Sequence, residues 1–282
     1  MKVGVIGLGR MGIPIAQRLL DDGHEVLVHT RSPRILAEIG LAGARLCTLS
    51  SEVATRADVV ITLLPTEDSV RQVYGELAGV ARDGQFFVDC STVSPGLNRW
   101  CAEQVARLGA RFLDAPVSGG PAGAREGTLT VMVGGGVEAY DRVLPVLRAF
   151  GKNIRLWGGV GAGQVIKLVN QLLVGIHTAA IAEAVALGTR LGADLGVIHE
   201  LVGASFGGST MMLRNVPRFS ARDFTPATPS GLILKDLGII HAEAKRTSTP
   251  IPLGCLAEQE FVAAGARGWV DEDMAALIKL WD

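Results

Sequence analysis

Apolar residues follow two different periods along this chain. Up to about residue 157, short apolar runs such as Lys2–Ile6, Val59–Pro65 and Phe86–Cys90 alternate with segments in which apolar residues recur every three or four positions. Runs that are apolar on both faces are typical of parallel strands covered by helices on each side. This alternation predicts an α/β fold with a doubly wound, mostly parallel sheet.

Beyond Gly163 only the helical period remains. It predicts a first helix from Gln164 to about Leu191, apolar on almost every face, and further helices at Leu195–Val202, Leu232–Arg246, Leu253–Ala264 and Glu272–Trp281. A helix that is apolar all round must be covered by neighbouring helices or by another subunit. We therefore predict two domains, residues 1–160 and residues 161–282. The second is an all-α domain that begins with a long interdomain helix and assembles into a homodimer or homotetramer.

The totals restrict the class of protein more than its activity. The chain has 282 residues, is 48% hydrophobic and carries a formal net charge of −1, so no basic field favours nucleic acid or a membrane surface. Its cysteines form no CxxC pair, which argues against a disulfide framework or a metal site. We expect no signal peptide, and the longest uncharged helical run is short for a bilayer span. We expect a soluble cytoplasmic protein with a small-molecule partner.

The first strand leads directly into Gly7-Leu8-Gly9-Arg10-Met11-Gly12, and an amphipathic helix follows from Ile13 to Leu20. Strand, glycine turn and helix in this order form the dinucleotide-binding unit of Rossmann domains. Gly7 permits the tight turn, Gly9 lets a pyrophosphate approach the backbone, and Gly12 lets the helix pack on the strand. The N–H groups at the helix start attract the phosphates. The turn predicts a nicotinamide dinucleotide cofactor; the alternative is a structural turn in an ordinary α/β domain.

The end of the second strand, Glu25–Thr30, bears on which dinucleotide is bound. Domains that bind NAD carry Asp or Glu there, about twenty residues past the glycines, to hold the ribose hydroxyls. This chain has Thr30-Arg31-Ser32 instead. Arg31 can pair bidentately with a 2′-phosphate, and the hydroxyls of Thr30 and Ser32 can donate hydrogen bonds to it. The sequence favours NADP(H) over NAD(H), unless Arg31 is an ordinary loop arginine.

Two later strand ends carry further candidates for the cofactor site. Leu64-Pro65 closes a strand and lies beside the predicted crevice. Ser94-Pro95 predicts the N-cap and first position of the next helix, which leaves Ser91 and Thr92 for other roles. Thr92 then lies where a loop can meet the nicotinamide end.

Glycine-rich segments follow the next two predicted strands. Ser118-Gly119-Gly120 offers a hydroxyl and open backbone N–H groups, which suit a substrate carboxylate; a plain glycine loop is the alternative. Gly134-Gly135-Gly136 predicts a turn. In the helical part, Ser230 is a candidate helix cap, and Lys235 lies beside an apolar stripe.

Polar residues on the long apolar helix give the strongest indication of chemistry. Lys167, Asn170 and Gln171 are spaced i, i+3 and i+4, so they project from one side of the helix. Residues 168–182 carry no charge, which predicts that this helix is buried. A lysine buried beside two amides is more often functional than structural, although a solvated face is the alternative.

These motifs occur together in a recognisable order: GLGRMG, Leu64-Pro65, Asp89-Cys90-Ser91-Thr92, Asp114 through Gly120, Gly163 through Gln171, and Lys235-Asp236-Leu237. The chain resembles the β-hydroxyacid dehydrogenase family, which includes 3-hydroxyisobutyrate dehydrogenase, tartronate semialdehyde reductase and the glyoxylate/succinic semialdehyde reductases. The resemblance implies a Rossmann domain followed by an all-α domain like that of 6-phosphogluconate dehydrogenase, with the active site between them.

The resemblance also implies roles for single residues. Lys167 matches the family's catalytic acid/base and Asn170 the amide that orients the substrate. Ser118, Gly119 and Gly120 match the segment that holds the substrate carboxylate, while Thr92 and Lys235 match positions near the nicotinamide. Gln171 stands where the family often has asparagine and is expected to contribute to substrate binding.

The residues and the resemblance lead to the same hypothesis. The protein is expected to transfer a hydride between NADP(H) and a short 3-hydroxy acid or the matching semialdehyde, without a metal. An imine reductase and a non-catalytic cofactor-binding protein are the alternatives. The presence of Lys167 argues against both, and Ser118-Gly119-Gly120 argues further against the imine reductase.

Overall fold

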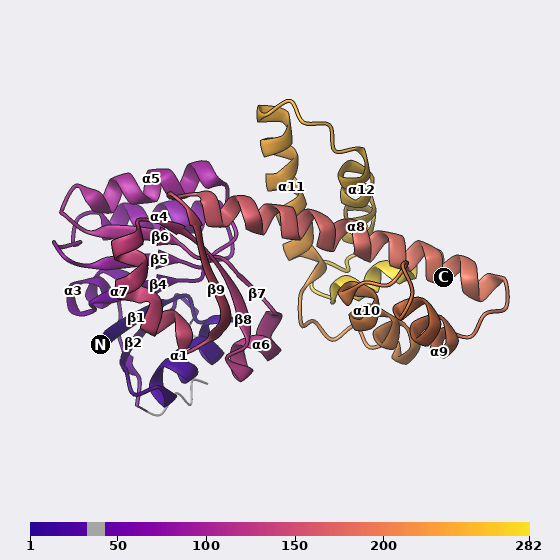
Figure 1. Ribbon diagram of the computed structural model, residues 1–282, viewed down its shortest axis with the longest axis horizontal. Helices are drawn as coiled ribbons and strands as arrows, with labels where there is room; N and C mark the ends of the chain where they lie inside the picture. Colours follow the sequence, from indigo (N-terminus) through magenta and orange to yellow (C-terminus); the bar gives the residue numbers. More distant parts are fainter. Residues whose placement is uncertain (33–42) are drawn as a thin grey trace. The chain divides into compact units, whose positions relative to one another are not determined.

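The computed structural model describes residues 1–32 and 43–282, which form two compact units, residues 1–167 and residues 168–282 (Figure 1). The boundary between the units lies within one long helix, α8 (Ala162–Arg190). The sequence prediction placed the boundary earlier, after residue 160. An α/β unit followed by a helical unit is the predicted fold class, and it is confirmed.

The first unit contains one sheet, in the order β3-β2-β1-β4-β5-β6-β8-β7 with β9 on β8. The pairs from β3 to β6 are parallel, whereas β8 runs antiparallel to β6 and β7. Strands β2 and β3 are added on one side of β1 and strands β4 to β6 on the other, so the strand order reverses beside β1, and open parallel sheets bind ligands at such a point. The strands are β1 (Lys2–Ile6), β2 (Glu25–His29), β3 (Arg45–Leu46), β4 (Val59–Thr62), β5 (Phe86–Asp89), β6 (Arg111–Asp114), β7 (Val117–Ser118), β8 (Leu129–Gly135) and β9 (Gly151–Gly158).

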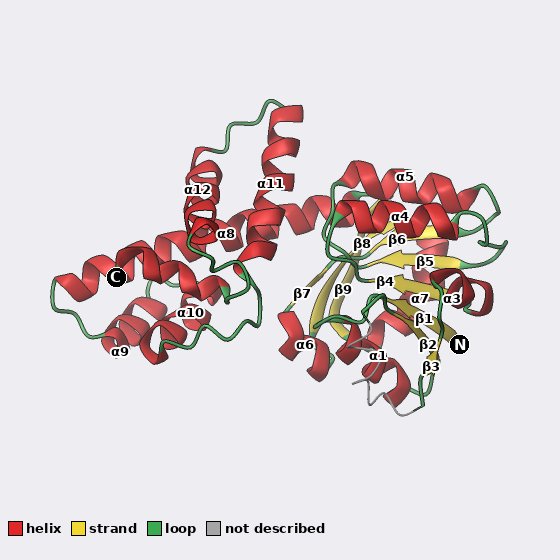
Figure 2. Ribbon diagram, turned by 180° about the vertical axis from the view of Figure 1, so that it is seen from behind, coloured by secondary structure: helices red, strands yellow, loops and turns green. Residues whose placement is uncertain are grey.

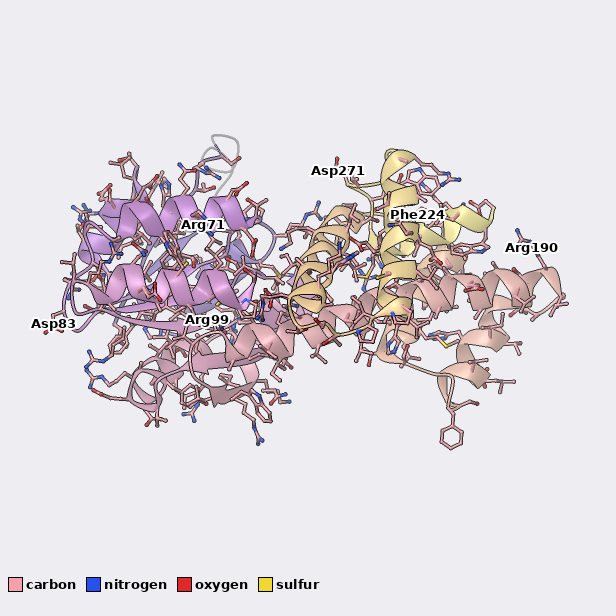
Figure 3. The ribbon with its side chains drawn as sticks, turned by 90° about the horizontal axis from the view of Figure 1, so that it is seen from above. Arg71, Asp83, Arg99, Arg190, Phe224 and Asp271 are labelled. Carbon is pink, nitrogen blue, oxygen red and sulfur yellow. The ribbon has the colours of Figure 1, made fainter. Side chains whose placement is uncertain are left out.

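Helices cover both faces of this sheet, as its doubly apolar strands require. One face packs against α1 (Gly12–Asp21), α6 (Gly120–Glu126) and α7 (Val137–Arg148). The other packs against α3 (Ser50–Arg56), α4 (Glu67–Leu77) and α5 (Pro95–Ala106). Figure 2 shows α4 and α5 on the opposite side of the sheet from α1 and α6. Figure 3 labels Arg71 of α4 and Arg99 of α5, two helices that lie side by side.

The second unit is helical around two apolar clusters. Glycine permits close helix packing in it: an added Cβ at Gly175 of α8 would lie 2.9 Å from a methyl group of Leu237. One helix, α10, was not predicted, because Pro217 and two arginines interrupt its apolar period. The elements after α8 are α9 (Leu195–Val197), the π-helix η1 (Ile198–Val202), α10 (Thr210–Ala221), α11 (Ser230–Arg246), α12 (Pro252–Ala266) and the 3₁₀-helix η2 (Met274–Trp281).

Two local predictions are wrong. Gly134 and Gly135 remain in β8, paired with Asp114 and Leu113, so the predicted triple-glycine turn is replaced by strand. An added Cβ at Gly134 would lie 2.5 Å from Asp114 Oδ1, so glycine here makes room for a buried carboxyl group. Ser230 does not cap α11, because its hydroxyl donates to the backbone carbonyls of Glu272 and Asp273 and Pro229 takes the N-cap position.

The long helix α8 also departs from expectation. By length and composition alone it could cross a membrane, whereas the sequence prediction judged its apolar run too short. The core helices of soluble proteins pass the same test of length and composition, and 39% of the most apolar window of α8 is buried within the structure.

Candidate active site

The predicted cofactor residues of the first unit share one edge of the sheet. After β1, β4, β5 and β6, the first residue donates a backbone hydrogen bond to the last residue of a neighbouring strand: Gly7 N to His29 O at 2.9 Å, Leu63 N to Ile6 O at 2.9 Å, Cys90 N to Thr62 O at 2.9 Å, and Ala115 N to Asp89 O at 2.7 Å. The loops after β1, β2, β4, β5 and β6 therefore lie in a row at the carboxyl ends of the strands. This is the edge at which open parallel sheets bind nucleotides.

The glycine turn has the space that a dinucleotide needs. Gly7 has φ +100°, and an added Cβ there would collide with Leu63 O, as one at Gly12 would with Gly7 O. At Gly9 an added Cβ would meet nothing within 4 Å, so this side of the turn is open. No side chain caps the start of α1, and its first turn has no acidic residue. The residues fit a pyrophosphate bound at a helix N-terminus.

The residues predicted to bind a 2′-phosphate on the ribose lie at the end of β2 and directly after it. Arg31 donates from Nη1 to Gln72 Oε1 on α4 at 3.0 Å, which orients its guanidinium. The Thr30 hydroxyl, nearly buried, accepts a hydrogen bond from Ser32 N at 3.3 Å. Basic and hydroxyl groups thus stand together where a domain that binds NAD carries an acid.

Buried hydrogen bonds fix the loops that carry Leu64 and Thr92. Ser91 Oγ donates to Asp89 Oδ1 at 2.6 Å and accepts from Leu64 N at 2.9 Å. Asp89, fully buried, also accepts from the Thr62 hydroxyl at 2.8 Å and from Asn98 Nδ2 at 2.8 Å. As predicted, Ser91 does not cap the helix that follows; its hydroxyl instead joins the two loops. Ser94 caps α5 as predicted, accepting from Leu97 N.

The start of α8 is held by a second buried carboxyl group. Asp114, at the end of β6, accepts hydrogen bonds from Gly161 N at 2.7 Å and from Gln164 N at 2.9 Å. Burial raises the pKa of Asp114 from 3.8 to about 6, although these N–H donors act to lower it. The first turn of α8 is thus tied directly to the sheet.

Lys167 lies one turn further along α8 and is only 6% exposed. Next on the same side of the helix, Asn170 Nδ2 donates to Gln171 Oε1 at 2.9 Å. Gln171 Nε2 donates in turn to Asp236 Oδ2 at 2.5 Å. Lys235 Nζ lies 2.9 Å from Asp236 Oδ1, forming an ion pair. Burial of Lys167 rules out the solvated-face interpretation.

The predicted carboxylate-binding segment lies at the junction of β7 and α6. Ser118 is half-buried at the end of β7, and Gly119 and Gly120 follow with φ values of +126° and +63°. Residues that carry a side chain rarely adopt such φ values, so this backbone path favours glycine at both positions. Across the described residues, no group of three or more His, Cys, Asp and Glu could hold a metal ion.

Comparison with known proteins agrees with this geometry. Residues 2–159 match the family model of the NAD-binding domain of 6-phosphogluconate dehydrogenase, and residues 161–281 match that of the NAD-binding domain of NADP-dependent 3-hydroxyisobutyrate dehydrogenase. The chain belongs to the β-hydroxyacid dehydrogenase family. Similar proteins of known activity include several hydroxy acid dehydrogenases. The NAD-binding domain of the family model agrees with the glycine turn described above.

Individual known proteins resemble the chain over nearly its full length. L-threonate dehydrogenase of Cupriavidus necator is 38% identical, over 99% of this chain and 96% of its own. The crystal structure of 3-hydroxyisobutyrate dehydrogenase from Salmonella typhimurium superposes with a TM-score of 0.91 at 34% identity, covering 99% of each chain. A solved complex of Psf3 with NADP+ and 2-OPP has a TM-score of 0.91 at 27% identity, covering 99% of this chain and 100% of its own.

Sequence reasoning assigned no role to the residues that hold the candidate site in place. Asp89, Asp114 and Asp236 were quoted only as parts of motifs, and Gln164 only as the start of a helix. All are buried and hydrogen-bonded to residues that carry predicted roles or to their neighbours. Only Asp236 had a local signal, because it stands directly beside Lys235 between apolar residues.

Proposed function

We propose that this member of the family transfers a hydride between NADP(H) and a short 3-hydroxy acid or the matching semialdehyde. The observation that carries the proposal is the burial of Lys167, a residue only 6% exposed, on a helix hydrogen-bonded to the nucleotide-binding sheet. Burying an amine is unfavourable unless something compensates. An acid/base role gives that placement a chemical reason.

The preference for NADP(H) is supported by charge at the end of β2. Arg31, oriented by Gln72, can neutralise a 2′-phosphate, and the neighbouring Thr30 and Ser32 introduce no negative charge. The similar complex with NADP+ favours the same cofactor. Gly7, Gly9 and Gly12, with Leu8, Arg10 and Met11, would hold the pyrophosphate, and Leu64, Pro65, Thr92 and Lys235 would lie toward the nicotinamide.

The remaining residues would serve substrate and proton. When bound, the nicotinamide supplies or accepts the hydride. In reduction, Lys167 as an ammonium group would stabilise and protonate the developing alkoxide; in oxidation, the neutral amine would accept the hydroxyl proton. Asn170 would orient the reacting oxygen, and Gln171 would hold Asn170 through their hydrogen bond. Ser118, Gly119 and Gly120 would bind the carboxylate.

We also propose that the protein is a cytoplasmic homo-oligomer. Apolar side chains on α8 remain uncovered within one chain, including Val169 at 55% exposed, Leu173 at 48% and Leu187 at 61%. A single soluble chain rarely leaves such a row to water. Size-exclusion chromatography with light scattering should give a dimer or tetramer mass; a monomer mass would contradict the assembly, and recovery in a membrane fraction would contradict the location.

The test of function is a substrate panel run with both nicotinamides. Short 3-hydroxy acids, semialdehydes and one cyclic imine would be assayed by NADPH or NADH absorbance. We expect turnover of a carboxylate-bearing substrate with NADPH, and a loss of about 100-fold or more in kcat for Lys167→Ala. Lys152→Ala, which removes an exposed lysine of β9, is the matched control. Turnover of the imine alone, or full activity of Lys167→Ala, would refute the proposal.

A further inference from the structure

Gln164 is a fully buried glutamine with no role in the chemistry proposed above. Its side-chain amide uses both ends on one loop: Nε2 donates to Ser91 O at 2.7 Å, and Oε1 accepts from Val93 N at 3.3 Å. The two loop residues flank Thr92. A single side chain of α8 therefore holds the backbone on both sides of a residue assigned to the nicotinamide end.

The backbone of Gln164 is held as firmly as its side chain. Its N–H donates to Asp114 Oδ2 at 2.9 Å, at the end of β6. The preceding Gly163 packs so closely that an added Cβ would collide with Met132 O of β8. The first turn of α8 thus has no freedom to slide, and the side chain of Gln164 transfers this fixed position to the Thr92 loop.

Lys167 lies three residues after Gln164, on the same side of the helix. The connection from Lys167 to the Thr92 loop is therefore one helical turn and one amide. Ser91 extends it, because its hydroxyl binds Leu64 N of the neighbouring loop. Two loops assigned to the cofactor and the helix of the proposed acid/base are joined through a single glutamine.

We propose that Gln164 is a positioning residue that sets the distance between the Thr92 loop and Lys167. This inference rests on the proposed function, in which one group lies by the nicotinamide and the other protonates the substrate. Hydride and proton transfer require the donors to be placed within a fraction of an ångström, and a misplacement of about 1 Å can lower turnover about 100-fold. An apolar residue at position 164 would fill the space but leave the loop unattached.

The test compares Gln164→Met with Gln85→Met. Gln85 is equally buried, and its Nε2 donates to the carbonyls of Ala54 and Ala57 at 2.5 and 2.9 Å while Oε1 accepts from Arg82 N at 3.2 Å. The control removes the same kind of buried amide from the same unit, away from the loop and the helix in question. Both variants are expected to lose similar thermal stability.

We expect Gln164→Met to lower kcat by roughly 10- to 100-fold while the NADPH dissociation constant changes by less than about threefold, since the glycine turn is untouched. Gln85→Met should retain kcat within about twofold. In the cofactor-free protein, amide hydrogen exchange over residues 90–94 should rise in Gln164→Met and stay at the wild-type level in Gln85→Met. Should the methionine variant fail to fold, Gln164→Asn shortens the amide by one methylene and is measured in its place.

Unchanged exchange over residues 90–94, or unchanged kcat, would overturn the inference. So would an equal fall in kcat for both variants, which would indicate a stability effect alone. Failure of the proposed function has a different signature, because the wild-type protein itself would then turn over no member of the substrate panel.

Discussion

Replacing Asp114 by Asn tests whether burial or hydrogen bonding dominates the pKa of the carboxyl group that holds the start of α8. The carboxyl group is fully buried, and burial favours its neutral form, whereas the N–H groups of Gly161 and Gln164 favour its charged form. Burial is the larger effect and raises the pKa of Asp114 from 3.8 to about 6. The folded protein therefore binds this proton more tightly than the unfolded chain does.

The size of the effect follows from the shift. A rise from 3.8 to about 6 corresponds to roughly 3 kcal/mol, at about 1.4 kcal/mol for each pKa unit. Because the folded-state pKa is the higher one, this stabilisation is fully present below the ordinary pKa and is lost as pH rises through about 6. Asp114→Asn has nothing to ionise there. Its stability relative to wild type should therefore increase by roughly 3 kcal/mol between about pH 4 and about pH 7.5.

Two measurements follow this change. Hydrogen exchange of core amides in β5 and β6 gives the opening free energy of the first unit alone, and comparing variant with wild type at each pH cancels the intrinsic pH dependence of exchange. The carboxyl ¹³C resonance that disappears in Asp114→Asn should titrate near pH 6 in the wild-type protein.

If hydrogen bonding outweighed burial at Asp114, the pH dependence of stability would have the opposite sign. If the two N–H donors outweighed burial, the folded-state pKa would fall below 3.8, and wild type would gain stability over the variant as pH rises. Parallel stability profiles, or a titration below the ordinary value, would refute the reasoning.

Three further predictions concern other parts of the chain. Arg31→Asp should shift the ratio of kcat/KM toward NADH by about tenfold or more, since it replaces a phosphate partner with a repelling charge; an unchanged ratio would refute the assignment. Gly9→Ala should weaken NADPH binding in fluorescence titration without lowering Tm, whereas Gly12→Ala should lower Tm, because only the second Cβ collides with backbone; equal Tm losses would contradict this. Asp273→Ala should destabilise the second unit by about 3 kcal/mol or more in thermal unfolding, since it strands Arg214, half-buried and hydrogen-bonded to both carboxylate oxygens; a loss below about 1 kcal/mol would count against it.

Local patterns were sufficient for much of the fold. The β-branched run Lys2–Ile6 is β1 as predicted, and Ser94-Pro95 starts α5 with the expected cap. Both depend on preferences of a few adjacent residues. The helix α10 was missed because its interior proline and its arginines interrupt the apolar period, although Met212, Val216 and Phe219 are buried on one side of it.

The supporting residues of the candidate site could not be read from local pattern. Gln171 binds Asp236, and Gln164 binds the backbone beside Thr92, across separations of 65 and more than 70 residues. No periodicity encodes a partner that distant. The sequence identified side chains of suitable chemistry, whereas the fold determines which of them are held and by what.

The buried polar groups at the sheet edge are costly elements that stability alone does not explain. A carboxylate such as Asp89 or Asp114 is unfavourable in a core unless every acceptor is used, and apolar packing would hold strands together at less cost. Each group instead joins backbone or side chains of separate loops: Asp89 joins the ends of β4 and β5, and Asp114 joins β6 to α8. Directional bonds fix a loop's position in a way that non-directional apolar contacts do not. Under the proposed function, in which a hydride donor and the amine of Lys167 must lie at a set distance, such directional bonds between strand ends would serve to hold that distance.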